Sequence, residues 1–502
     1  MWMTQFVRRQ RQVRPDAVAL ADENRELTWG LLDARTDALA AGLLDLGACP
    51  GDRVVVCSRN RAEVIELYIA AGKAGVIVCP VNPTFPAPEV EHIVRNADPV
   101  GVIAEEAVID RLDPALGAGW RVRLGGAQYE ALYETPPRAL PPARLDDVFA
   151  LVHTSATTGL AKGVALTHRA IAAGYTATAA DFGFGPGQVM LYPCPLFHGS
   201  MVVPLALLAA GGTVVVQNEF TPQRFLANLR RFRPTTAFLV PSMIRFAMMA
   251  KAFDAADLSS LREIIFGGAP MPRELLREAL RRFGCPVRNS YGLSEGGPIA
   301  TALYTESDLD EAGGGTTPLH SSGRMLPGCH IEVLDDAGAP VPAGEIGEVC
   351  VRGDGTMQGY WRDPAATAAA IRDGWLRTGD LGHMTEDGLI YLIDRRGDVV
   401  IRGGQNVYPA EIERVLAAQP GVRDVAVVGA PSAEWGQVPV AFVVAADADA
   451  PPPIPALLAA CAAELGSYKR PADVRLVEEI PRNAAGKILR KVLKQQLQPA
   501  AV

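Results

Sequence analysis

The sequence predicts an α/β protein with a large N-terminal domain and a small C-terminal domain. Up to about residue 300, short apolar segments alternate with amphipathic ones, which is typical of layered α/β subdomains. From Ile331 onward, short strands separated by Gly and Pro turns predict a small β-rich subdomain. After about Arg395 helices and strands alternate again over roughly 100 residues, enough for a separate small α+β domain. We therefore expect one domain over residues 1–396 and another over residues 397–502.

The first elements follow from hydrophobic periodicity. From Leu27 to Leu46 apolar residues recur at spacings of three and four, which predicts a helix after a short strand. Apolar runs predict buried strands over Asp52–Cys57 and Val76–Pro80, with a helix over Ala62–Ala74 between them. The segment Met201–Val216 is interrupted by Pro and Gly and is shorter than the roughly 20 apolar residues of a membrane span. We expect it to form a helix followed by a strand.

The later elements follow from the same patterns. A Pro-rich segment, Pro136–Arg144, predicts a subdomain edge before the strand Val148–His153. Three short β segments, IEVLDD, GEVCVRG and LIYLID, make up the β-rich part. The C-terminal region is predicted to contain, in order, the helix Pro409–Ala418, the strands Val422–Val428 and Pro439–Val444, the helix Pro455–Gly466 and a basic helix from Leu489.

The composition limits the class of protein. A chain of 502 residues with 49% hydrophobic and 21% charged residues is typical of a soluble protein of two or more domains. The net charge of -8 argues against a general nucleic-acid binder, although a local basic patch remains compatible with a small anionic ligand. The segment Met1–Arg11 lacks the apolar stretch of a signal peptide, so we expect a cytoplasmic protein without membrane association. Free thiols and no metal-site spacing are expected for the scattered cysteines Cys49, Cys57, Cys79, Cys194, Cys285, Cys329, Cys350 and Cys461.

A loop rich in hydroxyl and small side chains follows the strand that ends near residue 153. Small residues let backbone N–H groups approach phosphate oxygens, hydroxyls add donors, and a lysine supplies positive charge. The spacing does not match the GxxxxGK[ST] loop, and an ordinary Ser/Thr/Gly turn is the alternative. The residues that carry this phosphate-binding hypothesis are Thr154, Ser155, Ala156, Thr157, Thr158, Gly159 and Lys162.

A second segment combines an aromatic ring, a glycine, a hydroxyl and a carboxylate. Its aromatic ring is suited to stacking on a base, and its carboxylate to Mg²⁺, which binds one or two carboxylates together with substrate phosphates. A helix start capped by the serine is the alternative. The residues are Asn289, Tyr291, Gly292, Ser294 and Glu295.

Two further segments carry single charged residues. Asp380 follows a Thr-Gly turn, where a carboxylate can accept hydrogen bonds from ribose hydroxyls. Lys487 follows Gly486 beside an apolar helix start. A solvated β-turn and a solvated surface cation are the respective alternatives.

Taken together, in this order, the motifs resemble the superfamily of acyl-CoA synthetases, peptide-synthetase adenylation domains and luciferases across nearly the whole chain. The family's phosphate loop resembles residues 154–163, its aromatic gate Pro195–Gly199 with His198, and its adenine and magnesium motif residues 291–295. Further matches are the adenine segment Gly268, Ala269 and Pro270, the ribose aspartate Asp380, the segment with Ile393 and Arg395, the glycines Gly403 and Gly404, and the C-terminal lysine Lys487.

The resemblance implies an ATP-dependent ligase that works in two half-reactions. Lys487 would catalyse formation of an acyl-adenylate from ATP and a small-molecule carboxylic acid, with the phosphate loop on the β- and γ-phosphates. His198 and Glu295 would complete the catalytic set, and Glu295 with Thr154 would bind Mg²⁺. A mobile C-terminal domain would then rotate and present the face around Gly403 and Gly404 to a thiol, most simply that of coenzyme A.

Some positions depart from the family pattern. Ala156 stands where Gly is usual, Ala161 where Pro is usual, and Gly397 where the hinge usually has Asp or Lys. Asp394 replaces a common Gly, and Gln437 follows Trp-Gly where Glu is frequent. No catalytic group is lost by these changes, and Gly397 predicts a permissive hinge because glycine absorbs large φ/ψ changes.

The sequence identifies neither the nucleophile that accepts the acyl group nor the carboxylic acid that is activated. A carrier-protein pantetheine on a separate chain, an amine, an oxygen nucleophile or a small inorganic nucleophile could replace coenzyme A, and Arg402 and Lys469 are candidates for coenzyme A phosphates or ordinary surface cations. His198 stands where amino-acid-activating domains usually have Asp, which argues against α-amino acids. A catalytically silent nucleotide-binding relative is the non-enzymatic alternative, and the protein is expected to be a monomer or a homodimer. The acyl pocket is expected near residues 197–202, 240–245 and 292–301.

Overall fold

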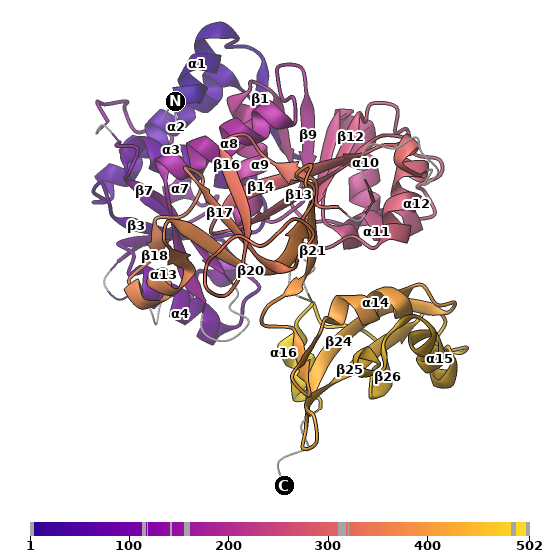
Figure 1. Cartoon of the computed structure of the whole chain (residues 1–502). Coiled ribbons are helices and arrows are strands. Elements are labelled where there is room, and N and C mark those ends of the chain that lie inside the picture. The colour runs from indigo at the N-terminus through magenta and orange to yellow at the C-terminus, as the bar shows by residue number, and fades with distance from the viewer. Residues whose placement is uncertain are drawn as a thin grey trace. The chain divides into compact units, whose positions relative to one another are not determined.

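The computed structural model describes residues 5–112, 117, 119–140, 143–154, 161–309, 318–319, 321–482 and 488–497 (Figure 1). By the packing of its backbone the chain divides into two compact units. The first contains residues 1–331 and 351–376, and the second contains residues 332–350 and 377–502. The mixed α/β architecture with a small C-terminal part confirms the predicted fold class. The predicted domain boundary between residues 396 and 397 stays a prediction.

The first unit contains a nine-stranded sheet. Its order is β15-β14-β13-β12-β11-β9-β10-β1-β2. The strands are β15 (Arg324–Met325), β14 (Gly297–Tyr304), β13 (Val287–Leu293), β12 (Glu263–Gly267), β11 (Thr236–Leu239), β9 (Val189–Tyr192), β10 (Thr213–Val216), β1 (Val18–Ala21) and β2 (Glu26–Thr28). The neighbours β13, β12, β11 and β9 run parallel, so their carboxyl ends share one edge.

A seven-stranded sheet forms the other layer of the first unit. Its order is β18-β8-β7-β4-β3-β5-β6. The strands are β18 (Gly359–Tyr360), β8 (Lys162–Thr167), β7 (Val148–Thr154), β4 (Ile77–Val81), β3 (Arg53–Cys57), β5 (Gly101–Ala104) and β6 (Trp120–Arg123). All five residues of β4 are buried, as expected of a central strand covered on both faces.

Helices cover both sheets of the first unit. They are α1 (Gln5–Val13), α2 (Trp29–Asp45), α3 (Ala62–Ala74), α4 (Ala87–Ala97), α5 (Glu106–Ile109), α7 (Ala127–Leu132), α8 (His168–Asp181), α9 (Val202–Ala209), α10 (Pro222–Phe232), α11 (Pro241–Met249), α12 (Arg273–Phe283) and α13 (Pro364–Ala370), with 3₁₀ turns η1 (Gly199–Met201) and η2 (Glu306–Leu309). The predicted helix over 62–74 is confirmed residue for residue, and the helix–strand interpretation of 201–216 is confirmed by α9 and β10. In the part of the chain that the structure describes, no helix combines the length and apolarity that crossing a bilayer requires.

The β-rich part of the chain forms a five-stranded sheet, which confirms the predicted small β-rich subdomain. Its order is β16-β17-β20-β19, and β21 pairs with β20. The strands are β16 (Cys329–Leu334), β17 (Gly347–Gly353), β19 (Ile371–Arg372), β20 (Trp375–Met384) and β21 (Ile390–Arg395).

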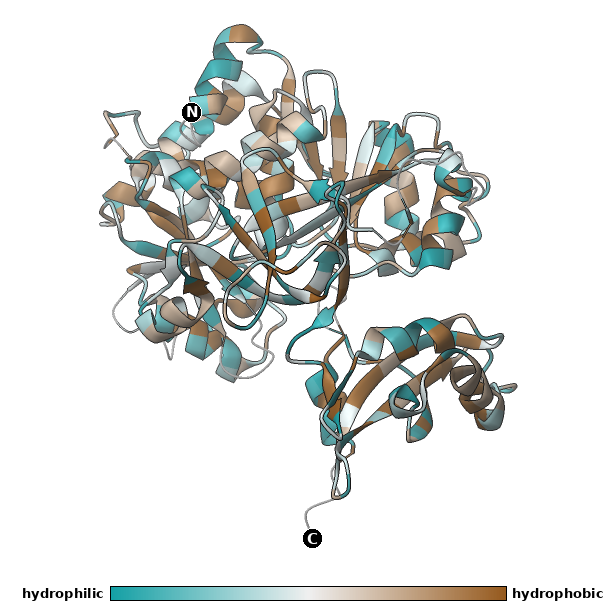
Figure 2. Ribbon diagram, viewed as in Figure 1, coloured by the Kyte–Doolittle hydropathy of each residue, from teal (hydrophilic) through white to brown (hydrophobic). Residues whose placement is uncertain are grey.

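The C-terminal part of the second unit has a sheet with helices on both faces. Its order is β23-β22-β25-β24, and β26 pairs with β25. The elements are β22 (Val400–Arg402), β23 (Gln405–Val407), α14 (Pro409–Ala417), β24 (Val422–Ser432), β25 (Gly436–Ala445), α15 (Ile454–Glu464), η3 (Ser467–Lys469), β26 (Asp473–Val477) and α16 (Arg490–Gln495). The alternating side chains of β24 explain why helices cover both faces of this sheet. Val425 and Val427 pack in the cluster that includes α14 and α15, whereas Ala426 and Val428 pack with Leu493 of α16. Figure 2 shows the resulting concentration of apolar residues in the strands of this sheet.

Candidate active site

The nine-stranded sheet gathers several predicted motifs at one edge. His198 follows β9, Gly268 follows β12, and Tyr291 and Gly292 lie near the end of β13. Because these strands are parallel, the segments that leave their carboxyl ends lie at the same edge, where open α/β sheets bind ligands. Figure 1 shows β12 and β13 next to each other in the sheet. The fold therefore places motifs that are up to about 90 residues apart in sequence at one edge.

The predicted adenine segment lies between β12 and α12. Gly268 has a φ of +79°, a left-handed conformation in which L side chains are strained. Gly267, just before it, pairs with Ser290 on β13, so the segment Gly268–Pro270 starts beside Asn289 and Tyr291. The Tyr291 ring is buried and Asn289 is half-buried. This combination of an aromatic ring and a backbone turn is suited to holding a flat heterocycle.

His198 is half-buried beside Phe197. Its ring packs edge to face against Phe197 with centroids 4.7 Å apart. Burial lowers the pKa of His198 to about 4, so the imidazole carries no charge at neutral pH. The next residue, Gly199, approaches Ser294 closely, since a Cβ at this position would lie 3.0 Å from the Ser294 Cα atom. His198 is therefore suited to packing and hydrogen bonding, and not to holding an anion as a cation.

A pH profile checks this assignment. We expect kcat/KM for the carboxylic acid to show no ionisation of His198 between about pH 6 and pH 9, because protonation of a group with a lowered pKa takes place below that range. His198→Gln should change the level of the profile and keep its shape. An inflection near pH 6.5 that disappears in the variant would show that His198 titrates normally.

Glu295 stands in the turn between β13 and β14. Leu293 pairs with Gly297, which makes residues 294–296 a tight hairpin turn. The backbone N–H of Met357 donates to the Glu295 carbonyl at 2.7 Å, and the Tyr360 hydroxyl donates to the Glu295 Oε1 atom at 2.9 Å. The half-buried carboxylate is thus held from both its backbone and its side chain.

Lys162 and Thr154 close the hairpin that carries the predicted phosphate loop. Thr154 at the end of β7 pairs with Lys162 at the start of β8. The Lys162 ammonium lies 4.9 Å from the centre of the Tyr360 ring. Tyr360 is therefore the side chain that links Lys162 to Glu295, although the two belong to different sheets. The intervening predicted residues Ser155, Ala156, Thr157, Thr158 and Gly159 lie outside the described residues.

Tyr360 was not identified as a site residue from the sequence. It lies 65 residues after Glu295 in the chain, and no periodicity connects the two. The available signal was the aromatic pair in Gly359-Tyr360-Trp361, followed by Asp363 and Pro364 as a helix start. Strand β18 positions it, since Tyr360 pairs with Val164 of β8.

The donor set fits a magnesium ion bound together with phosphates. The described part of the chain contains no group of three or more His, Cys, Asp or Glu residues that could hold a metal by themselves. Mg²⁺ requires only one or two protein carboxylates when substrate phosphates supply other ligands. Glu295 in the turn between β13 and β14 and Thr154 at the end of β7 carry oxygen atoms of the kind that Mg²⁺ prefers, and would be the residues to hold it.

In the second unit, Asp380 and Arg395 form a pair. Strands β20 and β21 place them directly opposite each other, and Arg395 Nε lies 2.8 Å from Asp380 Oδ1. Asp380 is buried, and its backbone N–H donates to Thr378 Oγ1 at 3.0 Å. Ile393, on the same strand as Arg395, is half-buried. The structure thus joins two predicted nucleotide residues in one ion pair.

The glycine pair Gly403 and Gly404 forms the turn between β22 and β23. Gly403 donates its N–H to the Trp435 carbonyl at 2.8 Å. The Arg402 guanidinium donates to the carbonyl oxygens of Tyr468 and Arg470 at 3.2 and 3.1 Å, and Lys469 lies 2.7 Å from a Glu411 oxygen. Both candidate coenzyme A cations therefore already have partners within the second unit. Lys487 lies outside the described residues.

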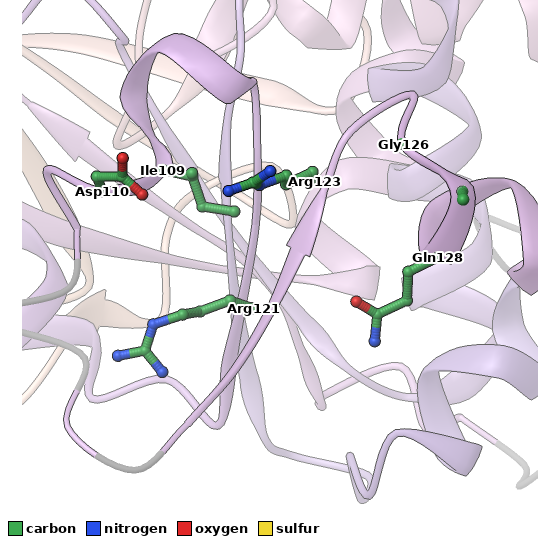
Figure 3. Close-up of a pocket in the computed structure, with 7 residues that line it drawn as sticks. Ile109, Asp110, Arg121, Arg123, Gly126 and Gln128 are labelled. Atoms are coloured by element: carbon green, nitrogen blue, oxygen red, sulfur yellow. The ribbon is translucent and has the colours of Figure 1, made fainter.

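A surface hollow of about 360 Å³ lies elsewhere in the first unit (Figure 3). Arg121 and Arg123 of β6 line it, together with Asp110 and Gln128. The Arg121 guanidinium donates to the Gly119 carbonyl at 2.7 Å, and Arg123 forms an ion pair with Glu106 at 3.0 Å. The described residues predicted for nucleotide binding do not line this hollow, and we assign no function to it.

Comparison with known proteins identifies the family. The model of the AMP-binding enzyme matches residues 7–361, and that of the AMP-binding enzyme C-terminal domain matches residues 411–487. The chain belongs to the AMP-binding enzyme family. This confirms the resemblance drawn from the ordered motifs.

The relatives are ligases of acids. The chain is 34% identical over 498 residues to the fatty acid–[acyl-carrier-protein] ligase ScoC of Streptomyces coeruleorubidus, covering 97% of this chain and 94% of that protein. It is also 34% identical to a feruloyl-CoA synthase of Amycolatopsis sp, with 97% of each chain covered. ATP-bound MatB from Rhodopseudomonas palustris has the same fold, with a TM-score of 0.91, 28% identity and 99% of each chain covered. These findings confirm the predicted enzyme class, an AMP-forming acid–thiol ligase.

Proposed function

We propose that this enzyme activates a small, medium-length or aromatic carboxylic acid with ATP and Mg²⁺ and transfers the acyl group to the thiol of coenzyme A. The observation that carries the nucleotide half of the proposal is the link through Tyr360. It brings Lys162, a cation suited to phosphates, and Glu295, a carboxylate suited to Mg²⁺, to one ring. We propose that the enzyme acts in the cytoplasm, and its composition is compatible with this.

In the first half-reaction a carboxylate oxygen of the acid attacks the α-phosphorus of ATP. A P–O bond forms, the bond to the bridging oxygen breaks, and pyrophosphate leaves with the bonding pair. Lys162 and the phosphate loop would hold the leaving pyrophosphate, and Lys487 would neutralise charge on the carboxylate and the α-phosphate. Mg²⁺ bound at Glu295 would supply charge stabilisation on the phosphate oxygens. The ion pair of Asp380 with Arg395 would orient the ribose.

In the second half-reaction a thiolate attacks the acyl carbon and AMP leaves. The thiol first gives its proton to solvent, the resulting thiolate forms the C–S bond, and the acyl C–O bond to the phosphate breaks with its bonding pair on AMP. We propose that the C-terminal domain rotates about a hinge near Gly397 between the two steps. The turn at Gly403 and Gly404 would then face the pantetheine arm. Arg402 and Lys469 would have to exchange their present partners before either could bind a coenzyme A phosphate.

A carrier-protein acceptor is the second candidate. ScoC, which is 34% identical over nearly the whole chain, is a ligase for an acyl-carrier protein. The feruloyl-CoA synthase is equally similar. Since both classes share the adenylation step, acceptor choice depends on the surface that meets the thiol.

The deciding experiment is a panel of short aliphatic, medium aliphatic, benzoic and cinnamic acids. Pyrophosphate release identifies the acid, and mass spectrometry with coenzyme A, with a phosphopantetheinylated carrier protein or with neither identifies the acceptor. We expect pyrophosphate release with at least one acid and a thioester in the coenzyme A reaction. A thioester formed only on the carrier protein would favour the second candidate, and silence across the panel would contradict an active ligase.

A further inference from the structure

Tyr360 lies on a segment that contacts two hairpins of the first unit. One hairpin, β13–β14, carries Glu295, and the other, β7–β8, carries Lys162. Residues 357–361 bond on one side to the turn at Glu295, through Met357 N–H at 2.7 Å. On the other side Gln358 N–H donates to the Ala165 carbonyl at 2.9 Å, and Trp361 N–H donates to the Gly163 carbonyl at 2.7 Å. The segment therefore fixes the turn between β13 and β14 relative to the hairpin β7–β8.

The Tyr360 side chain uses its two chemically different parts on two oppositely charged groups. Its hydroxyl donates to Glu295 Oε1 at 2.9 Å, a hydrogen bond to an ionised acceptor. Its ring lies 4.9 Å from the Lys162 ammonium, within the range of a cation–π interaction. Neither contact requires a ligand, so the phenol holds a cation and a carboxylate in place before nucleotide binds.

The backbone of Tyr360 is fixed by contacts that do not involve its ring. Its N–H donates to Thr367 Oγ1 at 2.9 Å, and Thr367 Oγ1 donates to the Asp363 carbonyl at 2.8 Å. Asp363 in turn caps α13 by accepting from Ala366 N–H at 2.8 Å. A change of the side chain at position 360 should therefore leave strand β18 in place.

We propose that Tyr360 is a positioning residue for the magnesium–triphosphate group of ATP, with its hydroxyl orienting the metal-binding carboxylate of Glu295 and its ring holding Lys162. This inference rests on the proposed nucleotide site. The inference assigns different roles to the two parts of the side chain. The hydroxyl orients the carboxylate that would bind the metal, and the ring holds the lysine that would bind the phosphates.

Two substitutions test the two halves separately. Tyr360→Phe keeps the ring beside Lys162 and removes the hydrogen bond to Glu295. Tyr360→Leu removes both. Binding of the non-hydrolysable α,β-methylene analogue of ATP is measured by calorimetry, first with EDTA and then across a series of free Mg²⁺ concentrations, with no acid or thiol present.

We expect Tyr360→Phe to raise the half-saturating free Mg²⁺ concentration about tenfold, because an oriented charge-assisted hydrogen bond is lost. Its affinity for the analogue in EDTA should equal that of the wild type. Tyr360→Leu should show the same Mg²⁺ effect and, in addition, bind the analogue about two- to fivefold more weakly in EDTA.

A matched control comes from another phenol that donates to a carboxylate. The Tyr133 hydroxyl donates to Glu66 Oε2 at 3.2 Å, and neither residue belongs to the proposed site. Tyr133→Phe should leave both binding constants unchanged. Unchanged Mg²⁺ dependence in Tyr360→Phe would overturn the inference, as would an equal loss of affinity with and without Mg²⁺. Because no acid is present, a failure to find an acid substrate would contradict the proposed function without affecting this result.

Discussion

Replacing Lys487 with alanine should lower the rate of acid-dependent pyrophosphate exchange by about 10²- to 10³-fold, the usual cost of removing one charge-stabilising group from a transition state. The reason is that the negatively charged carboxylate approaches the negatively charged α-phosphate in the transition state, and the positive charge of Lys487 would stabilise this arrangement. The same variant should form the thioester from a chemically supplied acyl-adenylate at close to the wild-type rate, because the second step needs no contact between Lys487 and the α-phosphate. Rapid-quench measurement of each half-reaction checks both statements.

The control for Lys487 is a second lysine from the same end of the chain. Lys491 is exposed on the terminal helix α16, so Lys491→Ala removes one positive charge four residues away. It should keep both half-reactions. An equal loss of both half-reactions in Lys487→Ala would indicate misfolding of the C-terminal region. Full exchange activity in the variant would remove Lys487 from the mechanism.

The hydrophobic pattern of the sequence is sufficient to predict most helices and strands, because burial in the fold requires apolar side chains. The helix over residues 62–74 and the strand over 347–353 have the predicted bounds, and both are apolar segments that are buried over all or most of their length. Strand β24 extends four residues beyond the predicted end at Val428, through Gly429 to Ser432. Its pairing with β25 continues there although the sequence no longer reads as apolar. Hydrogen bonding to β25 determines where β24 ends, and the hydrophobic pattern of β24 alone does not predict that end.

The site was predictable to the extent that parallel strands bring their carboxyl ends together. His198, Gly268 and Tyr291 were found as separate motifs, and the sheet order places them at one edge. Tyr360 could not be found in this way, because its role depends on an antiparallel contact between β18 and β8. Likewise, the existing partners of Arg402 and Lys469 arise from a loop that folds back near residues 468–470.

Loss of Arg490 should strongly destabilise the second unit. Its guanidinium lies 2.9 Å from Glu413 Oε1 and 3.3 Å from Asp398 Oδ2. Only 13% of its side chain is exposed. Burial raises the pKa of Glu413 to about 7, and the positive charge of Arg490 opposes that rise. Asp394 and Asp398 add negative charge to the same cluster. One cation therefore balances several carboxylates, and removing one partner of a buried ion pair costs about 3–5 kcal/mol.

We expect Arg490→Gln to lower the free energy of unfolding of the second unit by about 3 kcal/mol near neutral pH. Residues 377–502 contain one of the six tryptophans of the chain, so tryptophan fluorescence does not isolate this unit. Urea titration followed by hydrogen–deuterium exchange of peptides from residues 377–502 measures the change. Arg475→Gln is the matched control, since Arg475 pairs with Asp473 at 2.9 Å on the surface and should cost less than about 1 kcal/mol.

The pH dependence of the stability loss in Arg490→Gln should identify Glu413 as its source. A carboxyl group whose pKa is raised in the folded state favours folding at low pH, and this contribution declines as the pH rises from about 4.5 through about 7. Without Arg490 the pKa of Glu413 should rise further, so the decline should extend to more alkaline pH. The deficit of Arg490→Gln relative to the wild type should therefore be larger at pH 8 than at pH 5.5. Adding Glu413→Gln should recover a large part of it, because the double variant no longer buries an uncompensated carboxylate. A deficit that is the same at both pH values and unaffected by Glu413→Gln would assign the loss to packing of the arginine side chain instead.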